Sequence, residues 1–345
     1  MAYRRSRGKD RKMQPAVHTI TVKTDSVTSG ETGTFYCDLS QIASLVNRRF
    51  YRQGIQWAVA GFKTASAVGG VVQIGKLPNT WIMSNSWEKG FRSWQEMNKT
   101  ATEELPSIKP KFLDFKIYAD AAHHAAGFDA NLLPLDYGAA PYQAGEWVPS
   151  KYSIPRTDGT DTAISREIIA VGANYPGVGS SGFEAVSLIE GYAASRALPT
   201  AESDPNMPDD ASDVSGNTPE NWMGALKNDG IRQDEVVVED MLTENNQAPY
   251  PFEGDKAGAL DTMYPGGSNQ APTLEWHDTG IIFASRTDVN GNAAGFGAVN
   301  MKGGMFPCGL IRFDWTPVTS ANLVLQIDLV PGDHRGYLCA PMTDM

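Results

Sequence analysis

The chain has 345 residues with 34 glycines and 21 prolines, and charged residues make up only 20% of it. A composition so rich in turn formers favours an all-β protein with long loops over a helical protein. No stretch reaches the roughly 18 consecutive apolar residues of a membrane span, so we expect no membrane partner. The three cysteines, Cys37, Cys308 and Cys339, are too few and scattered for a disulfide framework or a zinc cluster.

Charge is distributed unevenly along the chain. The first twelve residues carry a net charge of +5, although the whole chain carries −11. Residues 1–116 carry a net +9 and residues 117–345 a net −20. Such polarity lets one molecule present a basic side and an acidic side to two different environments.

Residues 1–16 form a basic arm with almost nothing apolar to bury, so we expect it not to fold by itself. Its cations suit the neutralisation of nucleic-acid phosphates. A solvated tail or a nuclear-import signal is the alternative interpretation. The basic residues of the arm are Arg4, Arg5, Arg7, Lys9, Arg11 and Lys12.

The elements after the arm are mostly predicted strands, recognised by alternating and β-branched residues. A short helix is predicted at 40–50, and three basic residues lie at or just beyond its end. The predicted strands are 17–23, 54–65, 70–77, 111–119, 163–172, 183–192, 276–286, 308–313 and 323–330.

One longer helix is predicted at 85–105, because Asn85 and Glu88 have the spacing of a capping box. Residues 127–160 are expected to form a connection rich in proline, glycine and tyrosine. The segment 201–245 holds twelve acidic residues against Lys227 and Arg232, which indicates a long surface loop over about 195–275.

The pattern predicts one domain over residues 17–345, an all-β single jelly roll of two antiparallel sheets with one inserted helix and long loops. A two-domain β protein divided near residue 150 is the alternative. Neither architecture needs a cofactor.

Motifs for catalysis or metal binding are weak in this sequence. His123 and His124 are adjacent, and in a strand or coil adjacent side chains point to different sides. Residues 288–292 resemble the start of a calcium loop without its downstream glutamate, and the glycines of 177–182 lack the lysine of a phosphate loop. We therefore expect no enzymatic activity, no cofactor and no metal.

A second basic group follows the predicted short helix, with aromatic residues between its cations. This mixture suits a surface that follows phosphates and stacks on bases. The alternative is a set of strand edges kept soluble by charge. The basic members are Arg48, Arg49, Arg52, Lys63 and Lys76, and the aromatic members are Phe50, Tyr51 and Trp57.

Five segments carry a resemblance to a known family. They are MAYRRSRGKDRK at 1–12, NRRFYRQGIQWAVAGF at 47–62, LPNTWIMSNSWEKGFRSWQEM at 77–97, PKFLDFKIYAD at 110–120 and LVPGDHRGYLCAPMTD at 329–344. Together they resemble the capsid proteins of small circular single-stranded DNA viruses that encode a replication-initiator protein. The acidic middle of the chain has no counterpart in this resemblance.

The resemblance implies a jelly-roll subunit, sixty copies of which close into an icosahedral shell around single-stranded nucleic acid. It also implies a virion protein that assembles inside the host cell, with the nucleus as one location. Sixty arms would carry about 300 charges, whereas a genome encoding 345 residues needs at least about 1000 phosphates. The arms alone are too weak, so metal ions, polyamines or Arg48, Arg49 and Arg52 must supply further cations.

Two other functions are compatible with the sequence. A soluble carbohydrate-binding or hydrolytic jelly roll would stack sugars on loop aromatics and needs paired carboxylates in a cleft. A monomeric single-strand-binding protein is disfavoured by the −20 charge of residues 117–345, which repels phosphates.

Overall fold

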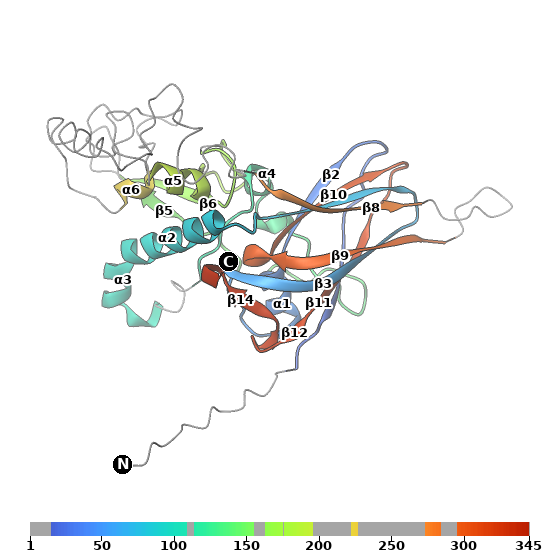
Figure 1. Cartoon of the computed structure of the whole chain (residues 1–345), viewed down its shortest axis with the longest axis horizontal. Helices are drawn as coiled ribbons and strands as arrows, with labels where there is room; N and C mark the ends of the chain where they lie inside the picture. The colour runs from blue at the N-terminus through green and yellow to red at the C-terminus, as the bar shows by residue number, and fades with distance from the viewer. Residues whose placement is uncertain are drawn as a thin grey trace, which may run out of the picture.

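A computed structural model describes residues 15–108, 114–154, 163–174, 176–195, 222–226, 273–283 and 295–344. Its centre is a sandwich of two antiparallel sheets packed face to face (Figure 1). The first sheet contains β1 (Thr19–Lys23), β11 (Val324–Leu329), β3 (Ile55–Ser66) and β9 (Gly297–Phe306) in that order. The second contains β2 (Gly33–Asp38), β10 (Leu310–Pro317), β4 (Gly70–Lys76) and β8 (Glu275–Ile282) in that order.

Strands that follow one another along the chain mostly change sheet. The first four alternate between the two sheets, and so do β8, β9, β10 and β11. Neighbours within each sheet therefore come from distant parts of the sequence, as in β1 with β11 and β2 with β10. This order of antiparallel strands is that of a jelly roll, and the predicted fold class is confirmed.

Alternation of side chains builds the core between the sheets. Every second residue of β10 is buried, and Phe313 and Trp315 are fully enclosed. The ring of Phe62 on β3 meets Phe313 edge to face at 5.8 Å, which joins the two sheets. Around these rings the aliphatic residues of β1, β4 and β11 complete one continuous core.

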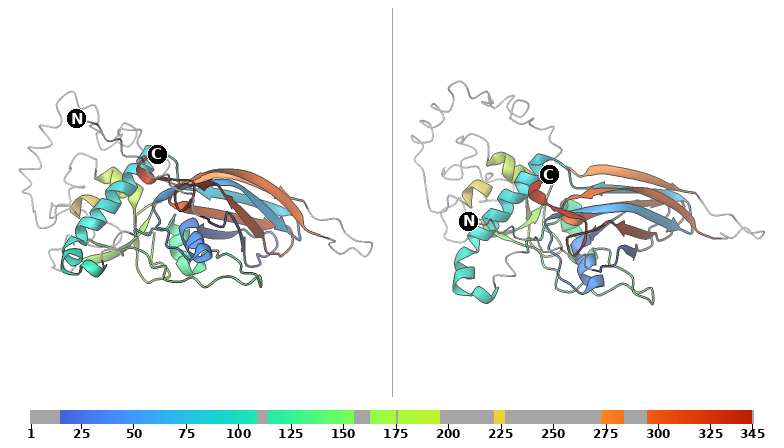
Figure 2. Two further views of the ribbon diagram at one scale, coloured as in Figure 1. Left: turned by 90° about the horizontal axis from the view of Figure 1, so that it is seen from below. Right: turned by 60° about the horizontal axis from the view of Figure 1, so that its bottom comes forward.

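The chain leaves the sandwich after β4 and returns at β8, and the insertion builds a second, helix-containing layer at one end of the sandwich (Figure 2). Its helices are α2 (Trp81–Met97), α3 (Lys99–Glu104), α4 (Ala121–Ala126), α5 (Leu188–Ala194) and α6 (Trp222–Ala225). Its strands are β5 (Tyr152–Ile154), β6 (Ile164–Ile169) and β7 (Ala185–Ser187). Lys76 Nζ lies 3.9 Å from Glu275 Oε2, so an ion pair joins the two ends of the insertion.

The second core is continuous with the sandwich, although the insertion is long. It includes Tyr36 of β2 and Leu310 of β10 beside Trp87 of α2 and Trp222 of α6. Trp222 is fully buried and packs 4.9 Å from the ring of Tyr152, so part of the expected acidic surface loop is core instead. Apart from 222–226 and 273–275, the acidic loop at 195–275 lies almost wholly outside the described residues.

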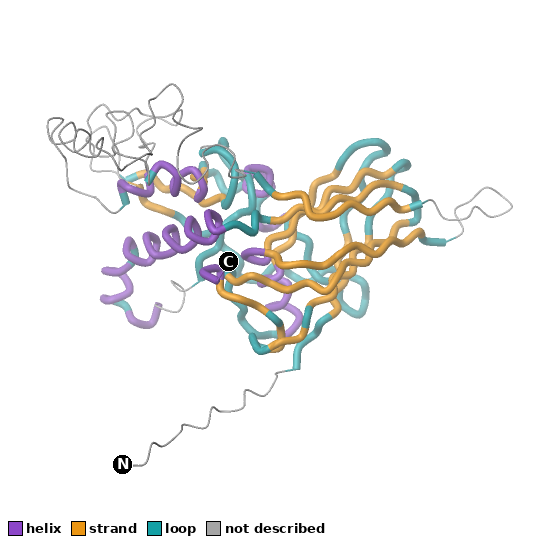
Figure 3. Tube along the Cα trace, viewed as in Figure 1, coloured by secondary structure: helices purple, strands orange, loops and turns teal. Residues whose placement is uncertain are grey.

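Short elements complete the described chain (Figure 3). Helix α1 (Leu39–Asn47) follows β2 directly, and the C-terminal segment pairs with the start of β3 through β14 (Cys339–Pro341). The remaining elements are β12 (Pro331–Gly332), β13 (Gly336–Tyr337), and the 3-10 turns Pro106–Ile108, Phe128–Ala130, Pro307–Gly309 and Met342–Asp344.

The predicted helix at 85–105 is wrong in its boundaries. Helix α2 begins at Trp81, because the Thr80 hydroxyl accepts a hydrogen bond from the Met83 amide at 3.4 Å and caps the helix. The expected capping residue Asn85 lies inside the helix, which ends at Met97 before α3 begins.

One further predicted strand is wrong, and another lies partly outside the described residues. Over 183–192 the chain forms only the short β7 and then α5, because Ser187 caps a helix over the apolar run that follows. Over 111–119 the described residues 114–119 are extended, and among them Tyr118 makes a single bridge to Ile169. Strands β2 and β9 were not predicted. Strand β9 contains three glycines, and its pairing with β3 overrides that low propensity.

Candidate nucleic-acid interface

The described chain starts beside the basic group that follows α1. Arg49 Nη1 donates a hydrogen bond to the carbonyl oxygen of Pro15 at 3.0 Å. The basic arm therefore emerges where Arg48, Arg49 and Arg52 lie. The arm residues Arg4, Arg5, Arg7, Lys9, Arg11 and Lys12 are outside the described residues, and their role stays a prediction.

Three hydrogen bonds fix the chain at this point. The Val17 amide donates to Asn47 Oδ1 at 3.0 Å, and Tyr337 Oη donates to the Val17 carbonyl at 2.6 Å. Asn47 Nδ2 in turn donates to Tyr337 Oη at 2.7 Å. Because Asn47 ends α1 and Tyr337 belongs to β13, the arm is rooted on two elements that are distant in sequence.

Arg48 ends helix α1 in an unusual backbone conformation. It follows Asn47 with φ 54° and ψ 37°, the left-handed region in which glycine is usual. Its side chain is exposed at the C-terminal end of the helix, where the helix dipole favours a cation. The strain shows that an arginine is tolerated here where glycine would fit the backbone better.

Arg335 joins this group from the other end of the sequence. Its guanidinium Nη1 donates to the Phe50 carbonyl, and its own carbonyl accepts a hydrogen bond from Tyr51 Oη at 2.9 Å. Strands β12 and β13 pair to form the C-terminal hairpin, and Figure 1 shows β12 close to α1. We call the set Arg48, Arg49, Phe50, Arg52 and Arg335 the arm-root surface. Arg335 was missed as a site residue, since its only local signal is the tight turn before Gly336.

The three aromatic residues predicted to stack on bases have different places. Phe50 is 48% exposed, but Tyr51 and Trp57 are fully buried. Tyr51, Trp57 and Tyr337 pack together with ring centroids 5.3 to 5.9 Å apart. The prediction for Tyr51 and Trp57 is therefore wrong, because their rings belong to the core, and Phe50 is the one of the three that faces solvent.

Lys63 and Lys76 do not lie with the arm-root surface. Lys63 is exposed on β3, eight residues beyond Ile55, which is about 26 Å along an extended strand. Lys76 ends β4 in the other sheet and pairs with Glu275. The structure thus brings together Arg48, Arg49 and Arg52 but separates both lysines from them.

A hollow of about 250 Å³ opens beside Phe50. Its walls come from α1, from the loop after that helix and from residues 144–147. They are Gln41, Ser44, Leu45, Arg48, Arg49, Phe50, Ala144, Gly145, Glu146 and Trp147. The lining holds two guanidinium groups against the one carboxylate of Glu146, so it suits an anionic ligand better than a reaction that needs paired carboxylates.

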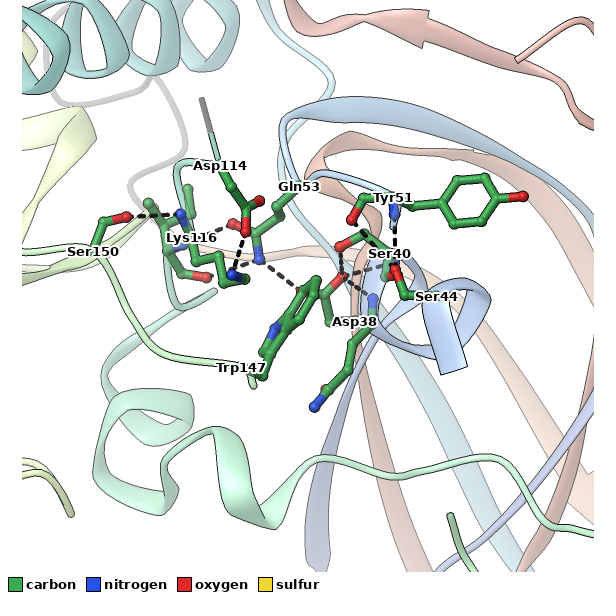
Figure 4. Close-up of polar contacts among 11 residues, drawn as sticks. Asp38, Ser40, Ser44, Tyr51, Gln53, Asp114, Lys116, Trp147 and Ser150 are labelled. Atoms are coloured by element: carbon green, nitrogen blue, oxygen red, sulfur yellow. Dashed lines mark hydrogen bonds and ion pairs between the residues drawn. The ribbon is translucent and has the colours of Figure 1, made fainter. Parts of the chain in front are cut away.

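Beneath the hollow a buried carboxylate holds several elements together (Figure 4). Asp38 caps α1 by accepting from the amides of Ser40 at 2.8 Å and Gln41 at 3.4 Å. It also accepts from Gln53 Nε2 at 2.9 Å and from Trp147 Nε1 at 3.1 Å. Burial raises the pKa of the Asp38 carboxyl to about 6, although the bonds from Ser40 and Gln53 oppose this rise.

Lys116 closes the buried network from the other side. Its ammonium pairs with Asp114 and lies 4.3 Å from the ring centroid of Trp147, a cation–π contact. Burial raises the pKa of Asp114, and the nearby Lys116 opposes this effect. Trp147 is therefore held by Asp38 along its edge and by Lys116 on its face, which gives the hollow a firm wall.

The two adjacent histidines lie in α4 and not in a strand or coil, and both are buried. Burial lowers the pKa of His123 to about 4. The Ala119 amide donates to His123 Nδ1 at 3.0 Å, so its ring proton sits on Nε2 and is donated to Asn131 at 2.8 Å. His124 Nε2 lies 3.1 Å from the buried Glu167. Among the described residues no three His, Cys, Asp or Glu side chains are grouped to hold a metal.

Comparison of the chain with protein-family models, curated proteins and solved structures found no match. In the part of the chain that the structure describes, no helix has the length and apolar character needed to cross a membrane. The fold defines a jelly-roll protein, and the arm-root surface is the cationic site that its geometry assembles.

Proposed function

We propose that this chain is a capsid subunit that self-assembles into a closed shell and packages single-stranded nucleic acid. The observation that carries the proposal is the hydrogen bond from Arg49 to Pro15. It joins the C-terminal end of the basic arm to the arm-root surface, on a jelly roll whose remaining net charge is acidic. A subunit whose basic arm leaves from a group of exposed arginines can hold a polyanion at that place.

Exposed apolar side chains on the second sheet support self-association. Val71 on β4 pairs with Ile281 on β8, and Phe283 lies two residues further along the same face. Val318 follows β10 and donates its amide to the Gly69 carbonyl, beside Val71. We call Val71, Ile281, Phe283 and Val318 the apolar patch, and its members are 38% to 79% exposed. Contiguous exposed apolar groups commonly mark interfaces between proteins.

The apolar patch and the arm-root surface occupy different places on the sandwich. The patch lies at the end of β4 and β8 that is farthest from the insertion, because the registers there pair Gly70 with Ile282. The arm-root surface is built on α1 and the C-terminal hairpin. A subunit can therefore contact its neighbours through one region and a nucleic acid through the other, as a shell requires.

The size of the assembly tests the proposal directly. Purified full-length protein at neutral pH and moderate salt is expected to give uniform particles of megadalton mass by light scattering and negative-stain microscopy. Phe283→Asp combined with Ile281→Asp places two charges in the apolar patch and is expected to prevent these particles. Wild-type protein that stays monomeric or dimeric under these conditions would contradict the capsid function.

Reversal of charge at the arm-root surface tests packaging. In the triple variant Arg48→Glu, Arg49→Glu and Arg52→Glu, particles should still form but protect less nucleic acid from nuclease. The matched control reverses Lys23, Lys63 and Lys302, three exposed lysines on the strands of the first sheet. Equal losses of protected nucleic acid in both triple variants would mean that packaging depends only on total charge. Unchanged protection in the arginine variant would contradict nucleic-acid binding at the arm-root surface.

A further inference from the structure

We propose that the hollow beside Phe50 binds one base of a single-stranded nucleic acid, stacked on the Phe50 ring, with the neighbouring phosphate on Arg48 or Arg49. This inference rests on the proposed function and assigns the arm-root surface a ligand contact beyond charge. An aromatic ring beside cations is the arrangement that single-strand-binding proteins use, because every base has a π-face and every nucleotide a phosphate.

The first support is the shape and lining of the hollow. Its volume of about 250 Å³ is large enough for one nucleobase but not for a folded partner. The Phe50 and Trp147 rings lie 6.4 Å apart, centroid to centroid, with an interplanar angle of 55°. Phe50 is half exposed, whereas its neighbour Tyr51 is fully buried, so the Phe50 ring has an open surface that a base can cover.

The second support is that the hollow has a prebuilt wall. Trp147 is only 9% exposed and is fixed by its hydrogen bond to Asp38 and by the ammonium of Lys116. A ligand that enters therefore meets a surface that needs little ordering, which lowers the entropic cost of binding.

The hydrogen bonds of the polar side chains in the hollow predict that it accepts any of the bases. Gln41 donates to the Ala144 carbonyl at 3.3 Å and accepts from Asn131 at 3.0 Å. Ser44 donates to the Ser40 carbonyl at 2.6 Å and accepts from the Tyr51 amide at 2.9 Å. Because these side chains already bond within the protein, stacking and charge dominate recognition. This suits a protein that must bind a whole genome and not one sequence.

Cations at the rim supply the phosphate contact. Arg48 and Arg49 line the hollow, and the C-terminal end of the arm is held to Arg49 through Pro15. Glu146 is exposed at the same rim and repels phosphate, so the phosphate is expected on the side of the two arginines.

Binding of two matched oligonucleotides to the full-length protein tests the base contact. The probes are a fluorescently labelled ten-nucleotide thymidine strand and a strand of equal length without bases, measured by fluorescence anisotropy at one salt concentration. Phe50→Ala is expected to weaken binding of the thymidine strand about tenfold and to leave the abasic strand unchanged. Phe50→Trp should retain the affinity, because it keeps a stacking ring.

Tyr137→Ala is the control variant, since Tyr137 is a fully exposed aromatic residue outside the hollow. It should bind both probes as the wild type does. Suppose that the wild type binds both probes but Phe50→Ala changes neither affinity, or lowers both equally. The proposed base contact at Phe50 is then wrong, whereas the proposed nucleic-acid binding is retained. If the wild type binds neither probe, the proposed packaging function fails as well.

Discussion

The segment from Asp38 to Trp57 contains two sets of side chains with opposite roles. Its exposed set belongs to the arm-root surface and includes Arg48, Phe50 and Arg52. Its buried set includes Asp38 and Trp57, which connect α1, β3 and the loop at 144–150. Neighbours in sequence thus differ in whether their side chains face solvent or the core.

This difference separates binding from stability. A cation in solvent contributes little to the free energy of unfolding, whereas the loss of a buried ring costs several kcal/mol. We therefore expect changes in the exposed set to alter nucleic-acid binding with little effect on folding. Changes in the buried set should alter folding and leave the surface charge as it was.

The largest expected effect is that of Trp57→Ala. Trp57 is fully buried between the sheets, so loss of its ring should lower the free energy of unfolding by about 3–5 kcal/mol. Urea unfolding followed by circular dichroism measures this change. The control Trp276→Ala removes a 66% exposed ring and should cost less than about 1 kcal/mol. Equal costs in both variants would contradict the buried position of Trp57.

The second prediction concerns pH and the two buried titratable groups Asp38 and His123. The pKa of Asp38 is raised from 3.8 to about 6, so its contribution to stability is full below pH 4 and is lost as pH rises through 6. The pKa of His123 is lowered from 6.5 to about 4, so its contribution is full above pH 6.5 and is lost as pH falls through 4. Each amounts to about 3 kcal/mol, and the two nearly cancel in the wild type.

Replacement of either residue should reveal the pH dependence of stability that the other one contributes. Relative to wild type, Asp38→Asn should lose about 3 kcal/mol of stability as pH falls from 6.5 to 4, because His123 then acts alone. His123→Gln should gain a similar amount of stability over the same change. Urea unfolding at several pH values gives these differences. The prediction is contradicted if the free energy of unfolding changes with pH in both variants as it does in the wild type. Neither the Asp38 carboxyl nor the His123 imidazole would then have the stated pKa.

The smallest expected effect lies in the exposed set, at Arg48. Because Arg48 has φ 54°, Arg48→Gly should relieve backbone strain and raise the free energy of unfolding by about 1 kcal/mol. The same change removes one cation, so the slope of log affinity against log salt should become shallower by about 0.7. Arg48→Ala loses the same charge but keeps the strained conformation, so it should show the slope change without the gain in stability.

Local patterns in the sequence were enough for the fold class and for most strands of the sandwich. Alternating residues at 54–65 and 323–330 correspond to β3 and β11, because alternation follows from the geometry of a half-buried strand. The basic group at Arg48, Arg49 and Arg52 was also predicted from local composition. The structure places these three residues together after α1.

Contacts between distant residues could not be predicted in this way. The bond from Arg335 to Phe50 joins positions 285 residues apart, and the anchor from Tyr337 to Val17 joins positions 320 apart. Burial of Tyr51 and Trp57 depends on the same C-terminal hairpin, which covers rings that resemble the exposed Phe50 in sequence.

The sequence by itself determined a β protein with a cationic arm and an acidic remainder, since propensity and net charge depend on composition and short-range order alone. Only the tertiary structure decided which aromatic ring faces solvent and where the arm is rooted. It also decided that Arg335 completes the arm-root surface. The physical reason is that burial and side-chain contacts depend on strand pairing between the two ends of the chain, and no local pattern encodes that pairing.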